Sequence, residues 1–397
     1  METLFSLLNE KYAQVCRAFF PKMSFVPFET LIHDGNECAE FIRAVLRDDD
    51  INQVDEQSTY YDFSKDRSTH AVLTYLVGLL FFDFKNLQSE IADMFYPNNT
   101  VNDQDIYRLW MLTSLYHDWG YTSKNIDKPN YVYKQKFDLL TDSYIGDSLS
   151  SLINYSNHYS KAFAHSYKQI MAYDRYIRKY RLEKNKQTRN ITSTKPIEMI
   201  DHGILGGVTI FNRLIHNSIK AGTKSEKEFL LAKTSCITIA QHNIYKSDST
   251  DRDKKYKKYS GGDELAYLYC NNGFSVGLGT PLLLLMSLVD TIECIKRFGK
   301  SSLASNYLQT ETVLNRIEMQ VTNDAFILDY SRLLKYIRKE KEPIVEEAYN
   351  DYINSSILGL VTWTDIRVLP EKTTDTPTRF VLSFAPSHFK SAALTIS

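Results

Sequence analysis

The feature that most constrains this chain is a set of ionisable residues placed inside apolar helical segments. Asp290 is the sharpest case, because nine apolar or small residues precede it in the run PLLLLMSLVD. Burial of an ionisable side chain is costly unless the side chain is paired, hydrogen-bonded or bound to a metal. Comparable interruptions occur at His70, His117–Asp118, His202 and His242. Five interruptions on five separate helical segments therefore predict a shared polar centre inside a helical bundle.

Segments with apolar residues at helical spacing cover most of the chain, so we predict a mainly α fold. Asp66 is the expected cap of the first long helix, and proline is tolerated in the first turn of the last one, at Pro281. The predicted helices cover about 67–84, 103–118, 148–188, a segment from 196, 226–242 and 281–298.

The ends of the chain differ from its middle. We expect a helical lead-in over 1–60, with two short helices separated by Pro21 and Pro27, and a main helical domain over 61–345. In the last region, 346–397, two stretches rich in β-branched and aromatic residues flank the turn-like PEKTTDTPT. They predict a small C-terminal β-hairpin from 358–369 and 380–384.

Composition excludes several classes of protein. The chain has 47 lysines and arginines against 48 aspartates and glutamates, so its net charge indicates no partner. Five widely spaced cysteines without a CxxC pair argue against a disulfide framework or a thiolate zinc site. The apolar run 71–82 is too short to span a bilayer, and charge appears too early for a secretory signal. We therefore expect a cytoplasmic protein with free thiols and no membrane partner.

Each polar residue also has a simpler interpretation when it is taken alone. His70 fits a hydrogen-bonded core histidine, His242 fits the dipole at a helix end, and Asp290 fits a partner for a buried arginine. The adjacent pair His117–Asp118, followed by Gly120, is rarer by chance and favours a functional site. To explain the whole ordered set, all of these simpler interpretations would have to hold at once, which is improbable.

In chain order these residues form the pattern H…HD…H…H…D, which resembles the HD superfamily of metal-dependent phosphohydrolases. Arg67 resembles part of the opening motif, and SLVDTIE resembles the closing helix. The resemblance covers about 61–300 and implies an HD-domain-like helical bundle within 61–345. It implies a first metal held by His70, His117, Asp118 and Asp290, and a second held by His202 and His242, with Asp118 as the bridge.

The resemblance implies one or two divalent transition-metal ions, namely Mn, Fe, Ni, Co or Zn, with Mg as a further candidate. Asp118 is the expected catalytic residue. Tyr121 stands where many relatives carry a lysine that contacts the phosphate, and Lys124, one turn later, is our candidate to replace it. Asn243 stands where several relatives carry a second histidine, which makes the second metal less certain than the first. Asp201 is either a partner that orients a ligand histidine or a helix cap.

Two basic clusters, at 175–186 and 246–258, precede His202 and follow His242. Each is either a solvated surface or an electropositive approach for a polyanionic substrate. Arg67, Tyr121, Lys254 and Lys255 are the predicted substrate-binding residues.

We expect hydrolysis of a phosphoester bond in a nucleotide or cyclic nucleotide. The alternatives are a single-strand nuclease and a catalytically degenerate nucleotide-binding or scaffold module. The partners implied are a phosphorylated small molecule or a nucleic acid. The sequence leaves open whether the chain forms a homo-oligomer.

Overall fold

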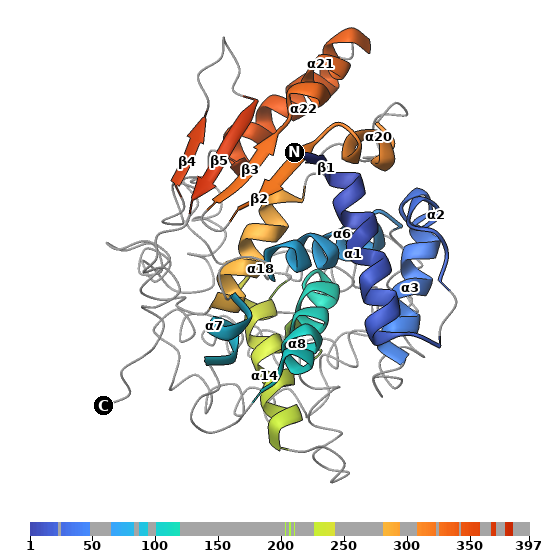
Figure 1. Ribbon diagram of the computed structural model, residues 1–397, viewed down its shortest axis with the longest axis vertical. Helices are drawn as coiled ribbons and strands as arrows, with labels where there is room; N and C mark the ends of the chain where they lie inside the picture. Colours follow the sequence, from blue (N-terminus) through green and yellow to red (C-terminus); the bar gives the residue numbers. More distant parts are fainter. Residues whose placement is uncertain are drawn as a thin grey trace, which may run out of the picture. The chain divides into compact units, whose positions relative to one another are not determined.

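The computed structural model describes part of the chain, and most of the described residues are helical, which confirms the predicted mainly α class. The described residues are 1–22, 25–47, 65–82, 87–93, 101–119, 226–242, 281–293, 308–322, 325–340, 343–357, 367–370 and 378–383, with Gly203, Gly206, Gly207 and Ile210. They divide into two compact units, Met1–Pro97 with Leu284–Ser397 and Asn98–Leu283, which are described separately (Figure 1).

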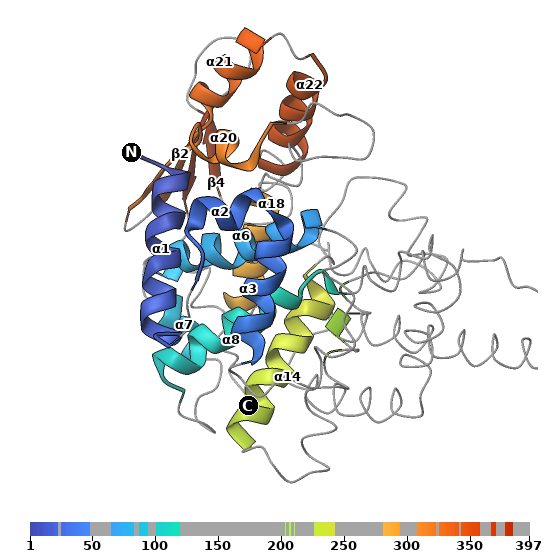
Figure 2. The same cartoon turned by 90° about the vertical axis from the view of Figure 1, so that its right-hand side faces the viewer.

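The N-terminal part of the first unit is a group of packed helices. Its elements are α1 (Leu4–Phe19), α2 (Phe28–His33), α3 (Gly35–Arg47), α6 (Lys65–Phe82) and α7 (Leu87–Asp93). Helix α1 begins where the Thr3 side chain accepts a hydrogen bond from the Ser6 amide at 3.2 Å. Figure 2 shows α1, α2 and α3 side by side. Three helices therefore precede residue 48, where the sequence predicted two.

Helix α6 is buried on all sides from Ser68 onward, which confirms the prediction of a core helix over 71–82. Each described side chain from Ser68 to Phe82 is buried. The predicted cap is wrong, because the helix begins at Lys65 and Asp66 lies within its first turn. Among the described helices, none combines the length and the apolar character that crossing a membrane needs.

A small antiparallel sheet completes the first unit. Its order is β1-β2-β3-β5-β4, formed by Glu2–Thr3, Glu318–Val321, Ala325–Asp329, Arg379–Ser383 and Arg367–Pro370. The antiparallel pair β4–β5, with Val368 opposite Leu382, confirms the predicted C-terminal pairing for the described part of 358–369, while 358–366 lie outside the described residues. The sequence did not predict β1, β2 or β3. Pairing of β1 with β2 joins the N-terminus to residues more than 300 positions later.

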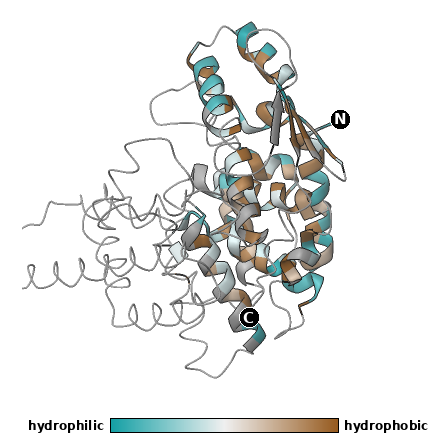
Figure 3. Ribbon diagram, turned by 90° about the vertical axis from the view of Figure 1, so that its left-hand side faces the viewer, coloured by the Kyte–Doolittle hydropathy of each residue, from teal (hydrophilic) through white to brown (hydrophobic). Residues whose placement is uncertain are grey.

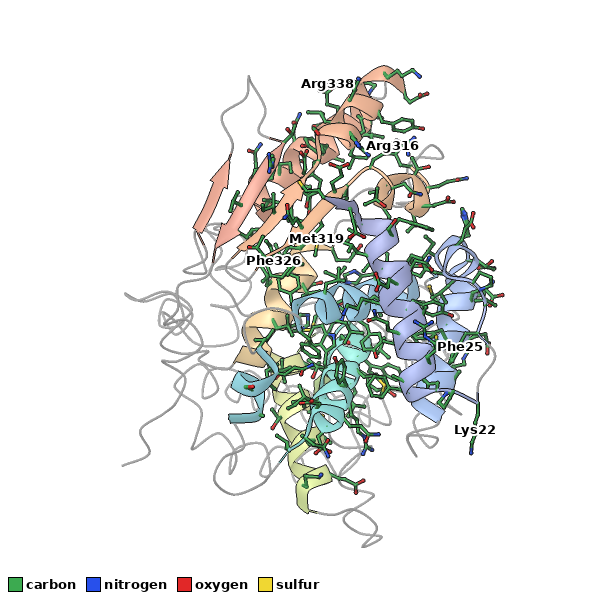
Figure 4. The ribbon with its side chains drawn as sticks, in the orientation of Figure 1. Lys22, Phe25, Arg316, Met319, Phe326 and Arg338 are labelled. Atoms are coloured by element: carbon green, nitrogen blue, oxygen red, sulfur yellow. The ribbon has the colours of Figure 1, made fainter. Side chains whose placement is uncertain are left out.

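The sheet packs against helices of the same unit. The ring of Phe326 in β3 stacks on that of Phe81 in α6, with centroids 3.8 Å apart, and Figure 4 labels Phe326 and the buried Met319 of β2. Helices α20 (Thr310–Leu314), α21 (Ser331–Glu340) and α22 (Pro343–Tyr352) follow, the last continued by a π-helical turn, Ile353–Ile357. Helix α21 shows hydrophilic and hydrophobic residues in Figure 3, and it buries Leu333, Leu334 and Ile337.

Two helices dominate the described part of the second unit, α8 (Asp103–Tyr116) and α14 (Glu226–Gln241). Helix α8 begins with a capping box between Asn102 and Asp105, at the start that the sequence predicted near 103. The sequence also predicted α14 and the helix α18 (Pro281–Ile292), whose residues from Leu284 onward belong to the first unit. Both predictions are confirmed.

Helices α8 and α14 run parallel and adjacent (Figures 1 and 2). Lys227 Nζ lies 2.8 Å from Asp105 Oδ2, and farther along, Thr113 Oγ1 donates to Ser235 Oγ at 3.1 Å. The residue numbers at these contacts therefore increase in the same direction along both helices, so their C-terminal ends meet.

Candidate metal centre

His117, Asp118 and His242 form a compact buried cluster where α8 and α14 end. Helix α8 ends at Tyr116 and α14 at Gln241, so each histidine is within one turn of a helix end. The exposed fractions of His117, Asp118 and His242 are 0%, 3% and 1%. One ligand atom from each residue lies within 4.8 Å of the others. Because they are two imidazoles and one carboxylate, these residues can hold a divalent ion and leave a coordination position open.

The backbone determines which nitrogen each of these histidines presents. His117 Nδ1 lies 2.6 Å from the Ser114 carbonyl oxygen, and His242 Nδ1 lies 2.7 Å from the Ile239 carbonyl oxygen. A carbonyl oxygen only accepts, so Nδ1 carries the hydrogen in both rings. In the neutral imidazole Nε2 then holds the lone pair that a metal requires. Both rings are therefore oriented as ligands by the same contact, three residues back along the chain.

The electrostatics of this cluster favour a cation. The C-terminal end of a helix carries a partial negative charge, and here two such ends meet. The Asp118 carboxylate adds a formal negative charge, with Oδ1 3.5 Å from His117 Nε2. A buried carboxylate is costly without a positive partner, so a divalent ion is a chemically suitable occupant.

Gly203 lies directly against His242. A Cβ atom built at Gly203 would stand 2.6 Å from the Ile239 oxygen and 2.8 Å from His242 Nδ1. These are the two atoms of the hydrogen bond that orients the His242 ring. A glycine is needed here because any side chain would collide with that pair.

The first unit contains a second buried cluster, formed by His70 of α6 with Asp290 and Glu293 at the end of α18. His70 Nε2 lies 3.1 Å from Asp290 Oδ1, and His70 Nδ1 lies 2.5 Å from Glu293 Oε2. His70 is 1% exposed and Glu293 is 3% exposed. One imidazole is thus held between two carboxylates.

This arrangement needs a hydrogen or a cation between His70 Nε2 and Asp290 Oδ1. A neutral imidazole that donates from Nδ1 to Glu293 would direct its Nε2 lone pair at the Asp290 carboxylate. A proton on Nε2 relieves that repulsion, and so does a metal ion bound by both atoms. Two ligands about 2.0–2.1 Å from one ion lie about 3.1 Å apart when they subtend roughly 100°. The observed 3.1 Å therefore fits two neighbouring ligands of a single ion.

The C-terminal part of the chain anchors the end of α18. Tyr352 donates from its hydroxyl to the Ile292 carbonyl at 2.7 Å, and the hydroxyls of Tyr330 and Tyr352 lie 2.9 Å apart. Since the Tyr352 hydrogen is already used, Tyr330 is the donor of the second bond. Both tyrosines are buried. They hold the backbone between Asp290 and Glu293.

A third group, Glu29, His33 and Glu311, lies on the surface of the first unit. His33 Nε2 is 2.8 Å from Glu311 Oε2, and their side chains are 40% and 31% exposed. The sequence offered no context for His33. An exposed pair of this kind is an ordinary surface ion pair, and it is a useful control for the buried clusters.

The structure places the predicted ligands in two groups. It brings His117, Asp118 and His242 together in one unit, and His70 with Asp290 in the other. The backbone of Arg67 lies in the first turn of α6. His202, Tyr121, Lys124, Lys254 and Lys255 lie outside the described residues, as do both basic clusters and the segment 148–188.

Sequence analysis missed Glu293 as part of the site. It is the last letter of SLVDTIE, three residues after Asp290, and this spacing returns a helical side chain to the same face. Comparison with known protein families, with curated proteins and with solved structures found no match to this chain. The chemistry of the described residues is therefore the basis on which a function can be proposed.

Proposed function

We propose that this chain is a metal-dependent phosphohydrolase that cleaves a phosphoester bond in a nucleotide or cyclic nucleotide. The observation that carries the proposal is the buried set His117, Asp118 and His242 at the meeting ends of two parallel helices. Both histidines are oriented to present Nε2, and the helix ends favour positive charge. This combination suits a bound divalent cation.

The donor set favours particular ions. Imidazole with carboxylate suits manganese, iron, cobalt, nickel or zinc better than calcium. When bound, such an ion supplies Lewis-acid stabilisation of phosphoryl charge and lowers the pKa of water.

The protein groups have separate tasks in this proposal. His117 and His242 hold the ion through Nε2, and the carbonyls of Ser114 and Ile239 keep both rings in the required tautomer. Asp118 would complete the ligand set with its carboxylate, and it is also the residue that we expect to orient the attacking water. The order of residues in the sequence extends the proposal to a binuclear centre. His117 would then join His70 and Asp290 at the first ion, His242 would join His202 at the second, and Asp118 would contribute its carboxylate to both.

Metal content per chain tests this proposal first. We would measure it by elemental mass spectrometry on purified wild type, Asp118→Ala and the surface control His33→Ala. Near two transition-metal ions in wild type and in the control, with a sharp fall in Asp118→Ala, supports the binuclear hydrolase. About one ion narrows the proposal to a mononuclear centre. No metal, even after reconstitution with manganese or nickel, contradicts the proposal and favours the binding-module alternative.

A phosphoester panel then tests the reaction. Mononucleotides, cyclic nucleotides and single-stranded oligonucleotides would be offered to the metal-loaded protein, with Asp118→Ala as the inactive reference. Turnover of the small substrates supports the proposal. Cleavage restricted to oligonucleotides, with activity that falls steeply as salt rises, identifies the nuclease alternative.

A further inference from the structure

We infer that Glu293 is a positioning residue. It accepts the Nδ1 hydrogen of His70 and thereby leaves Nε2 as the nitrogen that binds a metal. The inference rests on the proposed function, because it assigns a role toward the same metal centre. Its basis is the position of the ring between two carboxylates one helical turn apart. Glu293 Oε2 lies 2.5 Å from Nδ1, and Asp290 Oδ1 lies 3.1 Å from Nε2.

The two carboxylates differ in their access to solvent. The Glu293 side chain is 2% exposed, whereas that of Asp290 is 12% exposed. Glu293 also borders a small void whose other lining residues are all apolar, among them Leu8, Leu73, Val77 and Met319. Asp290 is therefore the more accessible of the two carboxylates, and Nε2 is the ring nitrogen beside it.

The chemistry of the ring follows from this asymmetry. Glu293 accepts the Nδ1 hydrogen, and Thr74 Oγ1, at 3.5 Å from Nδ1, is a distant second neighbour. With the hydrogen held at Nδ1, Nε2 presents its lone pair beside Asp290. A carboxylate partner fixes the orientation of a ligand histidine and increases its basicity. His117 and His242 have neutral carbonyl oxygens at Nδ1, whereas the buried His70 has a carboxylate there.

A purely structural role predicts something different. Glu293 and a protonated His70 would then form a buried ion pair whose loss lowers the stability of the metal-free protein but leaves metal affinity unchanged. A positioning role predicts that a variant with intact folding still binds the ion more weakly. Glu293→Gln separates the two, because glutamine keeps the volume and an accepting oxygen and removes only the charge.

The experiment measures zinc affinity of the full chain by competition with a chelator. The difference in zinc affinity between wild type and His70→Ala identifies the ion that depends on His70. Glu293→Gln is then compared with the control Glu311→Gln, which alters the carboxylate paired with the exposed His33. We expect Glu293→Gln to weaken that ion's affinity by about 10- to 100-fold in a variant that still unfolds cooperatively. Glu311→Gln should equal wild type.

A second measurement uses the wild-type protein alone, so its result does not depend on whether a variant folds. In zinc-loaded wild type labelled with 15N-histidine, NMR should show the His70 hydrogen on Nδ1 and zinc on Nε2. Three results would overturn this inference without contradicting the proposed metal centre. They are a zinc affinity of Glu293→Gln equal to that of wild type, a zinc affinity that does not change in His70→Ala, and zinc bound to Nδ1 of His70. Absence of zinc binding in wild type would overturn both the inference and the proposed function.

Discussion

The imidazole rings of His117 and His242 lie with their centroids 5.2 Å apart and their planes at 88°. The residues are separated by 125 positions, and they meet because α8 and α14 run parallel and end together. Each ring donates from Nδ1 to a carbonyl oxygen three residues earlier. Two residues at helix ends thus acquire the same orientation by the same local contact.

Zinc should stabilise the wild-type protein through these rings. A ligand that binds only the folded state adds about 2.7 kcal/mol at 100 times its Kd, so Tm should rise on addition of zinc. His242→Ala should remove most of this rise. His33→Ala, which alters an exposed histidine beside two carboxylates, should keep it. Thermal unfolding with and without zinc measures the difference, and equal shifts in all three proteins would exclude His242 as a ligand.

Gly203→Ala should disturb His242 without replacing any proposed ligand. The added methyl group would lie 2.6 Å from the Ile239 oxygen and 2.8 Å from His242 Nδ1. Such overpacking costs about 1–3 kcal/mol, and displacement of the ring should weaken zinc binding. A double-mutant cycle with His242→Ala checks the cause, because effects that act through one ring are not additive. Additive losses of stability would contradict this account.

Tyr352→Phe should destabilise the end of α18. It removes the donor to the Ile292 carbonyl and the acceptor for Tyr330, both in a buried setting. The unfolding free energy should fall by about 1–3 kcal/mol, as measured by urea denaturation. The control is Tyr336→Phe, whose ring lies under Arg316 and keeps that contact. This control should change stability by less than about 0.5 kcal/mol.

Alkaline pH should destabilise the protein through buried thiols. Burial raises the pKa of Cys38 from 9.0 to about 12, against a smaller opposing effect of a hydrogen bond from Thr69. The folded thiol keeps its proton where the unfolded thiol loses it. This contribution to stability is therefore complete below about pH 9 and is lost as pH rises through about 12. Denaturation midpoints from pH 8 to 11 should fall, and the fall should be smaller in Cys38→Ala.

Cys38 should also resist alkylation in the native protein. Its side chain is 0% exposed, and Sγ donates to the Leu31 carbonyl at 3.1 Å. Iodoacetamide at pH 8 followed by peptide mass spectrometry should find Cys38 modified only after denaturation. Rapid labelling under native conditions would show that the helices around it open readily.

Local features were predictable from the sequence because they depend on neighbours in the chain. The capping box at Asn102 and the proline that opens α18 mark helix starts that the structure confirms. The apolar segments around His70, His117 and His242 indicated burial, and all three are buried.

The partners of these residues were decided by the tertiary structure alone. Glu293 contacts a histidine 223 positions earlier, and β1 pairs with a strand near residue 319. Such pairings depend on which surfaces meet after the chain folds, and no spacing within one segment encodes them. The sequence by itself determined that ionisable residues must be buried on apolar helices, because helical periodicity and the cost of burial are local properties. Only the folded chain decided that a carboxylate holds one side of His70 and that backbone carbonyls hold His117 and His242.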